Sequence, residues 1–149
     1  MTFDEYKQER LGKKVRETIK LGYQCVSLIK HFAKIVHWKT LKWFSWSAIK
    51  WRETGSAFVW LPYQRVVYSG IGSPPRGAIV FFGKTKSNPY WHVAIAWSST
   101  EKQLRVMEQN AAQGDWDWMW GDEISIRSYP YKWGRTWDVL GRYMHYYLY

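Results

Sequence analysis

The chain has 149 residues and a formal net charge of +10, a size that suits one domain with its own core. Its single cysteine excludes an intrachain disulfide framework and a cysteine-rich zinc site. The acidic N-terminus lacks the apolar region of a secretory signal, and no apolar run approaches the roughly 18 residues of a membrane span. We therefore expect a single domain over residues 1–149, made in the cytoplasm, with no cofactor and no metal.

The positive charge is concentrated in the first third of the chain. Residues 1–52 contain 12 Lys and Arg against 4 Asp and Glu, a net +8, which leaves +2 for the rest. Such a basic region favours an anionic partner, although it can also serve solubility only. The 12 tryptophans are far above ordinary usage. Many must be core residues, and others can line a groove where flat rings stack on sugars or bases.

The N-terminal part of the chain predicts two helices. Thr2 and Glu5 fit a capping box for a helix that runs to about Leu11, with Gly12 at its C-terminal end. After a connector, apolar residues recur from about Gln24 at three- and four-residue spacing, which predicts a second helix. The recurring positions are Cys25, Leu28, Ile29, Phe32, Ile35 and Val36. Cys25 thus falls in the first turn, where the helix macrodipole favours an anion.

The basic, aromatic segment 38–53 can be irregular or helical, whereas the second half of the chain predicts β-strands. Turns are expected at 70–77 and 98–102, and a tryptophan-rich loop at 111–122. Expected strands are 63–68, 78–82, 92–97, 103–108, 124–127 and 139–143. The elements therefore predict an α+β fold in which N-terminal helices pack on a central antiparallel sheet.

Four residues are typical of a cysteine-nucleophile enzyme. The thiolate of Cys25 would be the nucleophile, and His92, at the start of an apolar strand, would be its base. Glu108 would orient His92, and Asn110, two residues further on, would face the same side and support that role. Taken singly, each residue has an ordinary reading as a core cysteine, a core histidine or a polar strand end.

The remaining histidines are weaker candidates for the base. His31 lies six residues after Cys25 on the same predicted helix and should point elsewhere. His37 lies in a basic segment, and His145 in a tyrosine-rich tail.

Four segments together resemble the CHAP family of cysteine peptidoglycan hydrolases, part of the wider NlpC/P60, papain-like group. Residues 22–26 resemble the nucleophile segment, and residues 75–81 its Pro-x-x-Gly-Asp-Ile-Val-Phe strand. Residues 92–95 resemble its Gly-His-Val-Ala-Ile strand, and residues 108–110 its Glu-Gln-Asn triplet. The order and spacing of the Cys, His, Glu and Asn residues are those of the family, and the likeness covers most of the chain.

The chain also departs from the family pattern at three positions. Ser27 stands where Asp is common, Ala78 replaces the Asp of the Gly-Asp strand, and Trp91 replaces the glycine before the histidine. Some family members bind calcium through Asp residues upstream of the cysteine. Residues 13–24 contain no Asp, so we expect no such calcium site.

The resemblance implies a papain-like fold and cleavage of a peptidoglycan amide. The enzyme would be an N-acetylmuramoyl-L-alanine amidase or a peptidoglycan endopeptidase that lyses the bacterial wall. Cys25, His92, Glu108 and Asn110 would be its catalytic residues. We expect substrate contacts from Tyr23, Gln24, Trp91, Trp116 and Trp118.

We expect a monomeric, CHAP-like catalytic domain with no separate wall-binding domain. Its basic N-terminal half would hold anionic wall polymer or a membrane surface. A phage endolysin that reaches the wall through a holin-type pore fits the lack of a signal peptide. One alternative is an interbacterial amidase effector with an immunity partner. Another is a non-enzymatic, tryptophan-rich module that binds glycan or nucleic acid, although we expect no nucleic-acid partner because no such motif is present.

Overall fold

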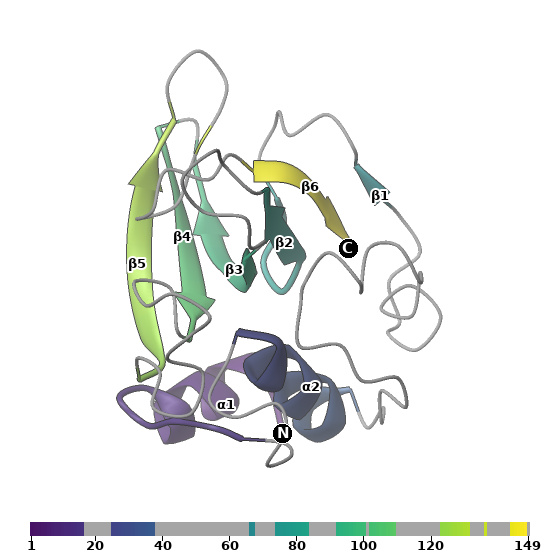
Figure 1. Cartoon of the computed structure of the whole chain (residues 1–149). Helices are drawn as coiled ribbons and strands as arrows, with labels where there is room; N and C mark the ends of the chain where they lie inside the picture. The colour runs from purple at the N-terminus through teal and green to yellow at the C-terminus, as the bar shows by residue number, and fades with distance from the viewer. Residues whose placement is uncertain are drawn as a thin grey trace.

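The computed structural model describes residues 1–16, 25–37, 66–67, 74–83, 92–100, 102–109, 123–131, 136 and 144–148 (Figure 1). Within these residues the fold is α+β, with two helices and one sheet whose strand order is β1-β6-β2-β3-β4-β5. Every described strand pair is antiparallel. The elements are α1 Phe3–Arg10, α2 Cys25–Val36, β1 Val66–Val67, β2 Ile79–Phe82, β3 His92–Ser99, β4 Gln103–Glu108, β5 Ser125–Pro130 and β6 Met144–Leu148. None of the described helices is long and apolar enough to cross a membrane.

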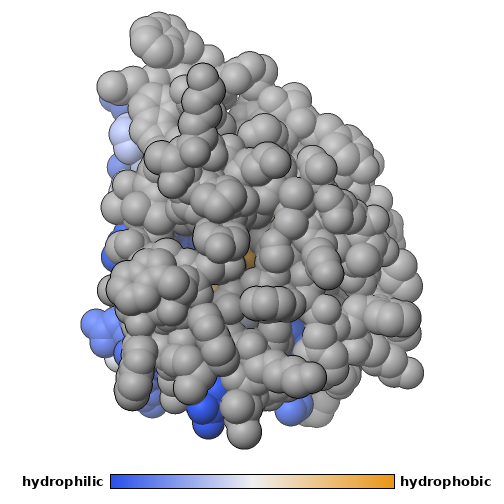
Figure 2. Space-filling view, viewed as in Figure 1, coloured by the Kyte–Doolittle hydropathy of each residue, from blue (hydrophilic) through white to orange (hydrophobic). Residues whose placement is uncertain are grey.

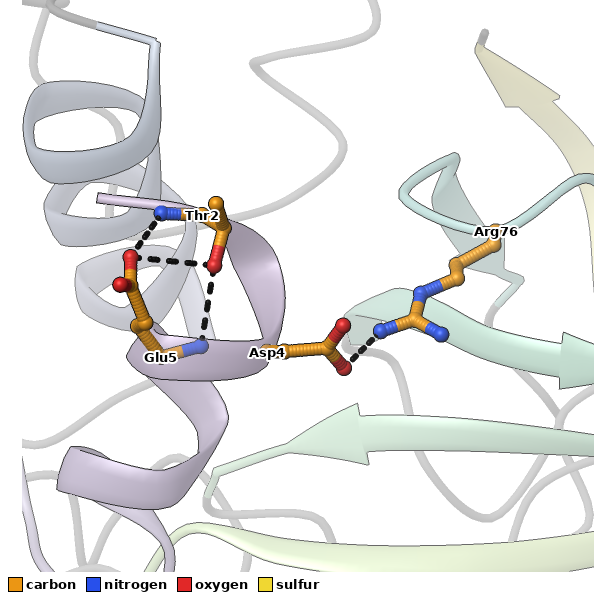
Figure 3. Close-up of polar contacts among 4 residues, drawn as sticks. All are labelled: Thr2, Asp4, Glu5 and Arg76. Carbon is orange, nitrogen blue, oxygen red and sulfur yellow. Dashed lines mark hydrogen bonds and ion pairs between the residues drawn. The ribbon is translucent and has the colours of Figure 1, made fainter.

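Helix α1 begins at the predicted capping box. The Glu5 amide donates to Thr2 Oγ1 at 3.2 Å, and the Thr2 amide donates to Glu5 Oε2 at 2.7 Å (Figure 3). These two bonds satisfy amides that the helix itself cannot. After the C-cap at Leu11, Gly12 adopts a φ of 78°, a conformation that glycine tolerates without steric cost. The chain then pairs with Ile124 through the Gly12 amide and the Lys13 carbonyl.

Helix α2 packs on the sheet through its apolar stripe, next to α1 (Figure 1). Its buried apolar residues recur at three- and four-residue intervals, so they line one face. Together with residues from α1 and the sheet they form what we call the helix-facing core. Its members are Tyr6, Val15, Cys25, Leu28, Ile29, Phe32, Ala33, Ile79, Phe81, Val93, Ile95, Met107 and Ile124.

A second core lies on the other face of the sheet. Successive strand residues point to opposite faces, so β2 sends Ile79 and Phe81 to the helix-facing core but Val80 and Phe82 to the second. We call the second group the opposite core, and it consists of Ala78, Val80, Phe82, Ala94, Ala96, Leu104, Val106 and Tyr129. Because both faces are covered, β2 is apolar at every position.

An aromatic and charged cluster joins α1 to the sheet at the surface. Arg76, in the turn before β2, pairs with Asp4 (Figure 3). Its guanidinium lies 4.1 Å from the Trp97 ring centroid and 5.5 Å from that of Phe3. Lys7 Nζ lies 4.3 Å from the Trp97 centroid, so two cations contact one indole. Figure 2 shows that the described side chains at the left and lower edges of this view are mainly hydrophilic.

The predicted elements agree with the structure for both helices and most strands. The β4 strand has the expected bounds, and β3 continues two residues further, to Ser99. The turn between them is short because Thr100 Oγ1 accepts the amides of Lys102 and Gln103, each at 3.2 Å. Of the strand expected at 63–68, only 66–67 are described. The expectations for 38–53 and 111–122 lie outside the described residues.

Strand β5 continues beyond its expected end, and a strand follows the residues that were expected to form the last one. Strand β5 runs from Ser125 to Pro130, and it tolerates the proline because it is an edge strand. The final strand is Met144–Leu148, whereas the strand expected at 139–143 lies outside the described residues. The sequence analysis assigns His145 to a tail. In the structure His145 belongs to β6, which pairs with β1 and β2.

Candidate active site

His92 and Glu108 form a buried pair at one end of neighbouring strands. His92 Nε2 lies 2.9 Å from Glu108 Oε2, and the two side chains are 1% and 0% exposed. The β3–β4 register pairs Ile95 with Met107, which sets Glu108 diagonally opposite His92 on the same face of the sheet. The structure thus contains the hydrogen bond expected between these residues. Their separation of 16 positions is bridged by the β3–β4 hairpin.

This hydrogen bond assigns the roles of the two imidazole nitrogens. An ionised carboxylate only accepts hydrogen bonds, so Nε2 carries the hydrogen and donates it to Glu108. Nδ1 is then the nitrogen that can accept a proton from a nucleophile. The ring stacks on Phe82, with centroids 6.0 Å apart and planes at 26°. These contacts hold the ring from the side of the opposite core.

Two residues of β5 hold the other oxygen of Glu108. The Tyr129 hydroxyl donates to Glu108 Oε1, and Arg127 Nη1 lies 3.6 Å from the same oxygen. A fully buried carboxylate requires such partners, because desolvation of an isolated charge costs several kcal/mol. Glu108 therefore receives donors from both neighbouring strands.

Cys25 is the first residue of α2 and so lies in the first turn, as the sequence predicts. It is buried at 7% exposure and belongs to the helix-facing core. Val93, the residue after His92, belongs to the same core. Helix α2 contacts β3, but the pairing of His92 with Phe82 places the imidazole on the face of the opposite core. The contact between the Cys25 thiol and the His92 ring stays a prediction.

Gln109, which follows β4 directly, anchors the segment between the helices. Its Oε1 accepts the Val15 amide at 2.7 Å, and its Nε2 donates to the Val15 carbonyl at 2.9 Å. The side chain is fully buried. This two-point contact fixes the chain ten residues before Cys25.

The other described histidines have different surroundings. His31 Nδ1 lies 2.8 Å from the Tyr6 hydroxyl, so this ring joins α2 to α1. His37 packs edge-on against Phe32, and burial lowers the pKa of His37. No group of three His, Cys, Asp or Glu side chains within the described ranges could hold a metal ion.

Several predicted site residues lie outside the described part of the chain, namely Tyr23, Gln24, Trp91, Asn110, Trp116 and Trp118. Conversely, the sequence interpretation missed Arg127, Tyr129 and Gln109. The strand expected at 124–127 ends at Arg127 and leaves Tyr129 beyond it. Arg127 and Tyr129 are two residues apart, and that alternation would have placed both on one face of a longer strand.

Comparison with solved structures shows that the fold resembles that of a known protein. The crystal structure of a wild-type endolysin, LysIME-EF1, superimposes with a TM-score of 0.57 at 15% sequence identity. The alignment covers 95% of this chain and 60% of the endolysin chain. The chain has an endolysin-like fold. It spans about three fifths of that neighbour's length. No protein-family model matches the sequence, and no curated protein matches it.

Proposed function

We propose that the protein is a cysteine peptidoglycan hydrolase of the CHAP type, with a papain-like arrangement of its helices and sheet. The observation that carries the proposal is the buried His92–Glu108 hydrogen bond between adjacent strands. Cys25, the first residue of a helix that contacts β3, is the proposed nucleophile. The endolysin-like fold supports the same class of activity.

In the proposed reaction, His92 Nδ1 takes the proton of the Cys25 thiol and the thiolate attacks a substrate carbonyl. The carbon–sulfur bond forms as the carbonyl becomes an oxyanion, to which the Cys25 backbone amide donates. The tetrahedral intermediate collapses, the carbon–nitrogen bond breaks, and His92 returns the proton to the leaving amine. Water, deprotonated by His92, then hydrolyses the thioester and regenerates the thiol.

Glu108 has an electrostatic and an orienting part in this scheme. It fixes the hydrogen on Nε2, so that the lone pair of Nδ1 is available to the thiol. It also stabilises the imidazolium that forms at each proton transfer. Asn110, two residues after Glu108 in the sequence, would support the same ring.

The substrate bond is either the amide between the lactyl group and L-Ala or a peptide bond of the stem or cross-bridge. Tyr23, Gln24 and the tryptophans at 91, 116 and 118 would contact it. The basic N-terminal half would keep the enzyme on anionic wall polymer. In this proposal the enzyme reaches the wall after release from the cytoplasm, as a phage endolysin does.

The test is clearing of purified peptidoglycan of several cross-link types by the wild-type protein and Cys25→Ala. We expect the wild type to reduce turbidity and Cys25→Ala to leave it unchanged. Lys34→Ala removes an exposed side chain from the same helix and should clear at the wild-type rate. Mass spectrometry of the released fragments identifies the bond. Equal clearing by wild type and Cys25→Ala, or no clearing of any wall type, would refute the proposal.

A second measurement examines the predicted contact between thiol and imidazole. Alkylation of Cys25 by iodoacetamide is followed against pH in the wild type and in His92→Gln. If the imidazole activates the thiol, His92→Gln should lose the reactivity near neutral pH. Identical pH profiles would show that His92 does not act on Cys25.

A further inference from the structure

We propose that Tyr129, with Arg127 beside it, is a positioning residue that holds Glu108 in the orientation required to fix His92. The inference rests on the proposed function, because it names the residue that keeps the catalytic base aligned. Tyr129 lies on β5, two strands away from His92. It acts on the imidazole only through the carboxylate between them.

Each oxygen of the Glu108 carboxylate has its own hydrogen-bond donor. Oε2 accepts from His92 Nε2, while Oε1 accepts from the Tyr129 hydroxyl. A carboxylate bound at one oxygen can still rotate about its terminal bond, which is soft. With both oxygens engaged from opposite strands, the rotation breaks at least one hydrogen bond. The plane of the carboxylate, and with it the direction of the bond to His92, is thereby fixed.

The burial of the carboxylate supports the same positioning role. Glu108 is fully buried and Tyr129 is nearly so, so solvent does not replace a lost donor at no cost. Among the described residues, the groups that face Glu108 are His92 from β3 and Arg127 and Tyr129 from β5. Arg127 Nη1 is buried and stands at 3.6 Å, beyond hydrogen-bond distance. Tyr129 is therefore the neutral hydrogen-bond donor to Glu108 Oε1, and Arg127 adds a positive charge that compensates the buried carboxylate.

A double-mutant cycle separates positioning from general packing. Hydrolysis of soluble peptidoglycan fragments is measured for wild type, Tyr129→Phe, Glu108→Ala and the double variant. Loss of a hydrogen bond to a charged group should lower kcat of Tyr129→Phe on the order of tenfold, with little change in KM. In the Glu108→Ala background the same substitution should change kcat less than about twofold, because residues that act as a unit are not additive.

The matched control is Tyr131→Phe. Tyr131 lies two residues further on, is half-buried, and its hydroxyl contacts Ser99 Oγ at 3.4 Å. It should retain wild-type kcat. An equal loss in Tyr131→Phe, or an equal effect of Tyr129→Phe in both backgrounds, would overturn the positioning role.

A measurement that needs no hydrolysis keeps this inference distinct from the proposed function. In protein labelled with ¹⁵N-histidine, the His92 Nε2–H signal is assigned by its loss in His92→Gln. We expect Tyr129→Phe to shift or broaden the signal towards its state in Glu108→Ala, and Tyr131→Phe to leave it in place. If the protein does not cleave peptidoglycan but the signal responds, the proposed function fails and the positioning stands. An unchanged signal in Tyr129→Phe refutes the positioning itself.

Discussion

Glu108 and Gln109 are adjacent in the chain, yet they anchor opposite faces of the sheet. Glu108 binds the imidazole of His92 next to the opposite core, and Gln109 binds the main chain of Val15, which belongs to the helix-facing core. Because neighbouring side chains at a strand end point in opposite directions, one dipeptide serves both layers. It holds the proposed base on one face and, on the other, the segment that leads to Cys25.

Glu108→Gln should severely reduce hydrolysis while leaving the fold intact. The amide is nearly the same size as the carboxylate, but it carries no charge to stabilise the imidazolium. By comparison with the orienting carboxylates of other triads, we expect kcat to fall by about 100-fold or more. Assays on soluble fragments measure the change. Glu123→Gln removes an exposed carboxylate just before β5 and should not alter kcat; a wild-type rate in Glu108→Gln would contradict the role of the charge.

Gln109→Leu should destabilise the protein because it leaves two buried main-chain groups without a hydrogen bond. The Val15 amide and carbonyl would both lose their hydrogen bonds. At about 1–3 kcal/mol for each of the two unsatisfied buried groups, we expect the free energy of unfolding to fall by roughly 2–6 kcal/mol. Urea denaturation measures it. Gln103→Leu places the same substitution at an exposed position of β4 and should change stability little. If the two variants are equally stable, the contact with Val15 contributes nothing.

Thr2→Ala should weaken the start of α1. The Thr2 hydroxyl accepts the Glu5 amide, and removal of such an N-cap costs about 1 kcal/mol. Thermal unfolding measures this loss. Ser128→Ala removes a hydroxyl from an exposed position of β5 and should have a smaller effect. A melting temperature of Thr2→Ala equal to that of the wild type would show that the cap does not contribute.

The same capping box should give α1 an acid-sensitive contribution. Hydrogen bonds from the Thr2 amide and hydroxyl lower the pKa of Glu5. A carboxyl whose pKa is lower in the folded state stabilises the fold above its ordinary value of about 4.3. That contribution is lost as pH falls through the lowered value. The stability difference between wild type and Glu5→Gln should therefore shrink in acid, and a difference that does not change with pH would contradict this contribution.

His37 should contribute a second pH dependence, with the same sign, closer to neutrality. Burial lowers its pKa, so the unfolded chain binds the proton more readily than the folded protein does. Stability should thus fall as pH drops from about 7 through the ordinary histidine value of about 6.5. Denaturation of wild type and His37→Gln at a series of pH values isolates the contribution of His37 to the pH dependence of stability. Parallel stability curves for the two proteins would show that His37 does not titrate differently on folding.

The helices and the site strands could be predicted from the sequence because their signals are local. The Thr2–Glu5 capping box spans four residues, and the apolar spacing of α2 repeats within one or two turns. Likewise, the first four residues of β4 alternate between exposed and buried positions. The sequence does not predict that β5 continues to Pro130 or that residues 144–148 form β6, because pairing with neighbouring strands, rather than local propensity, forms these segments.

The sequence by itself determined where Cys25, His92 and Glu108 stand on their elements, since residue type and periodicity act over a few positions. Only the tertiary structure decided which groups hold them. Tyr129 reaches Glu108 across 21 residues, and Gln109 reaches Val15 across 94. Such contacts depend on strand order and register, which follow from packing of the whole chain. The environment of the buried carboxylate is accordingly a property of the fold, because a charge without solvent must take its partners from whatever strands lie beside it.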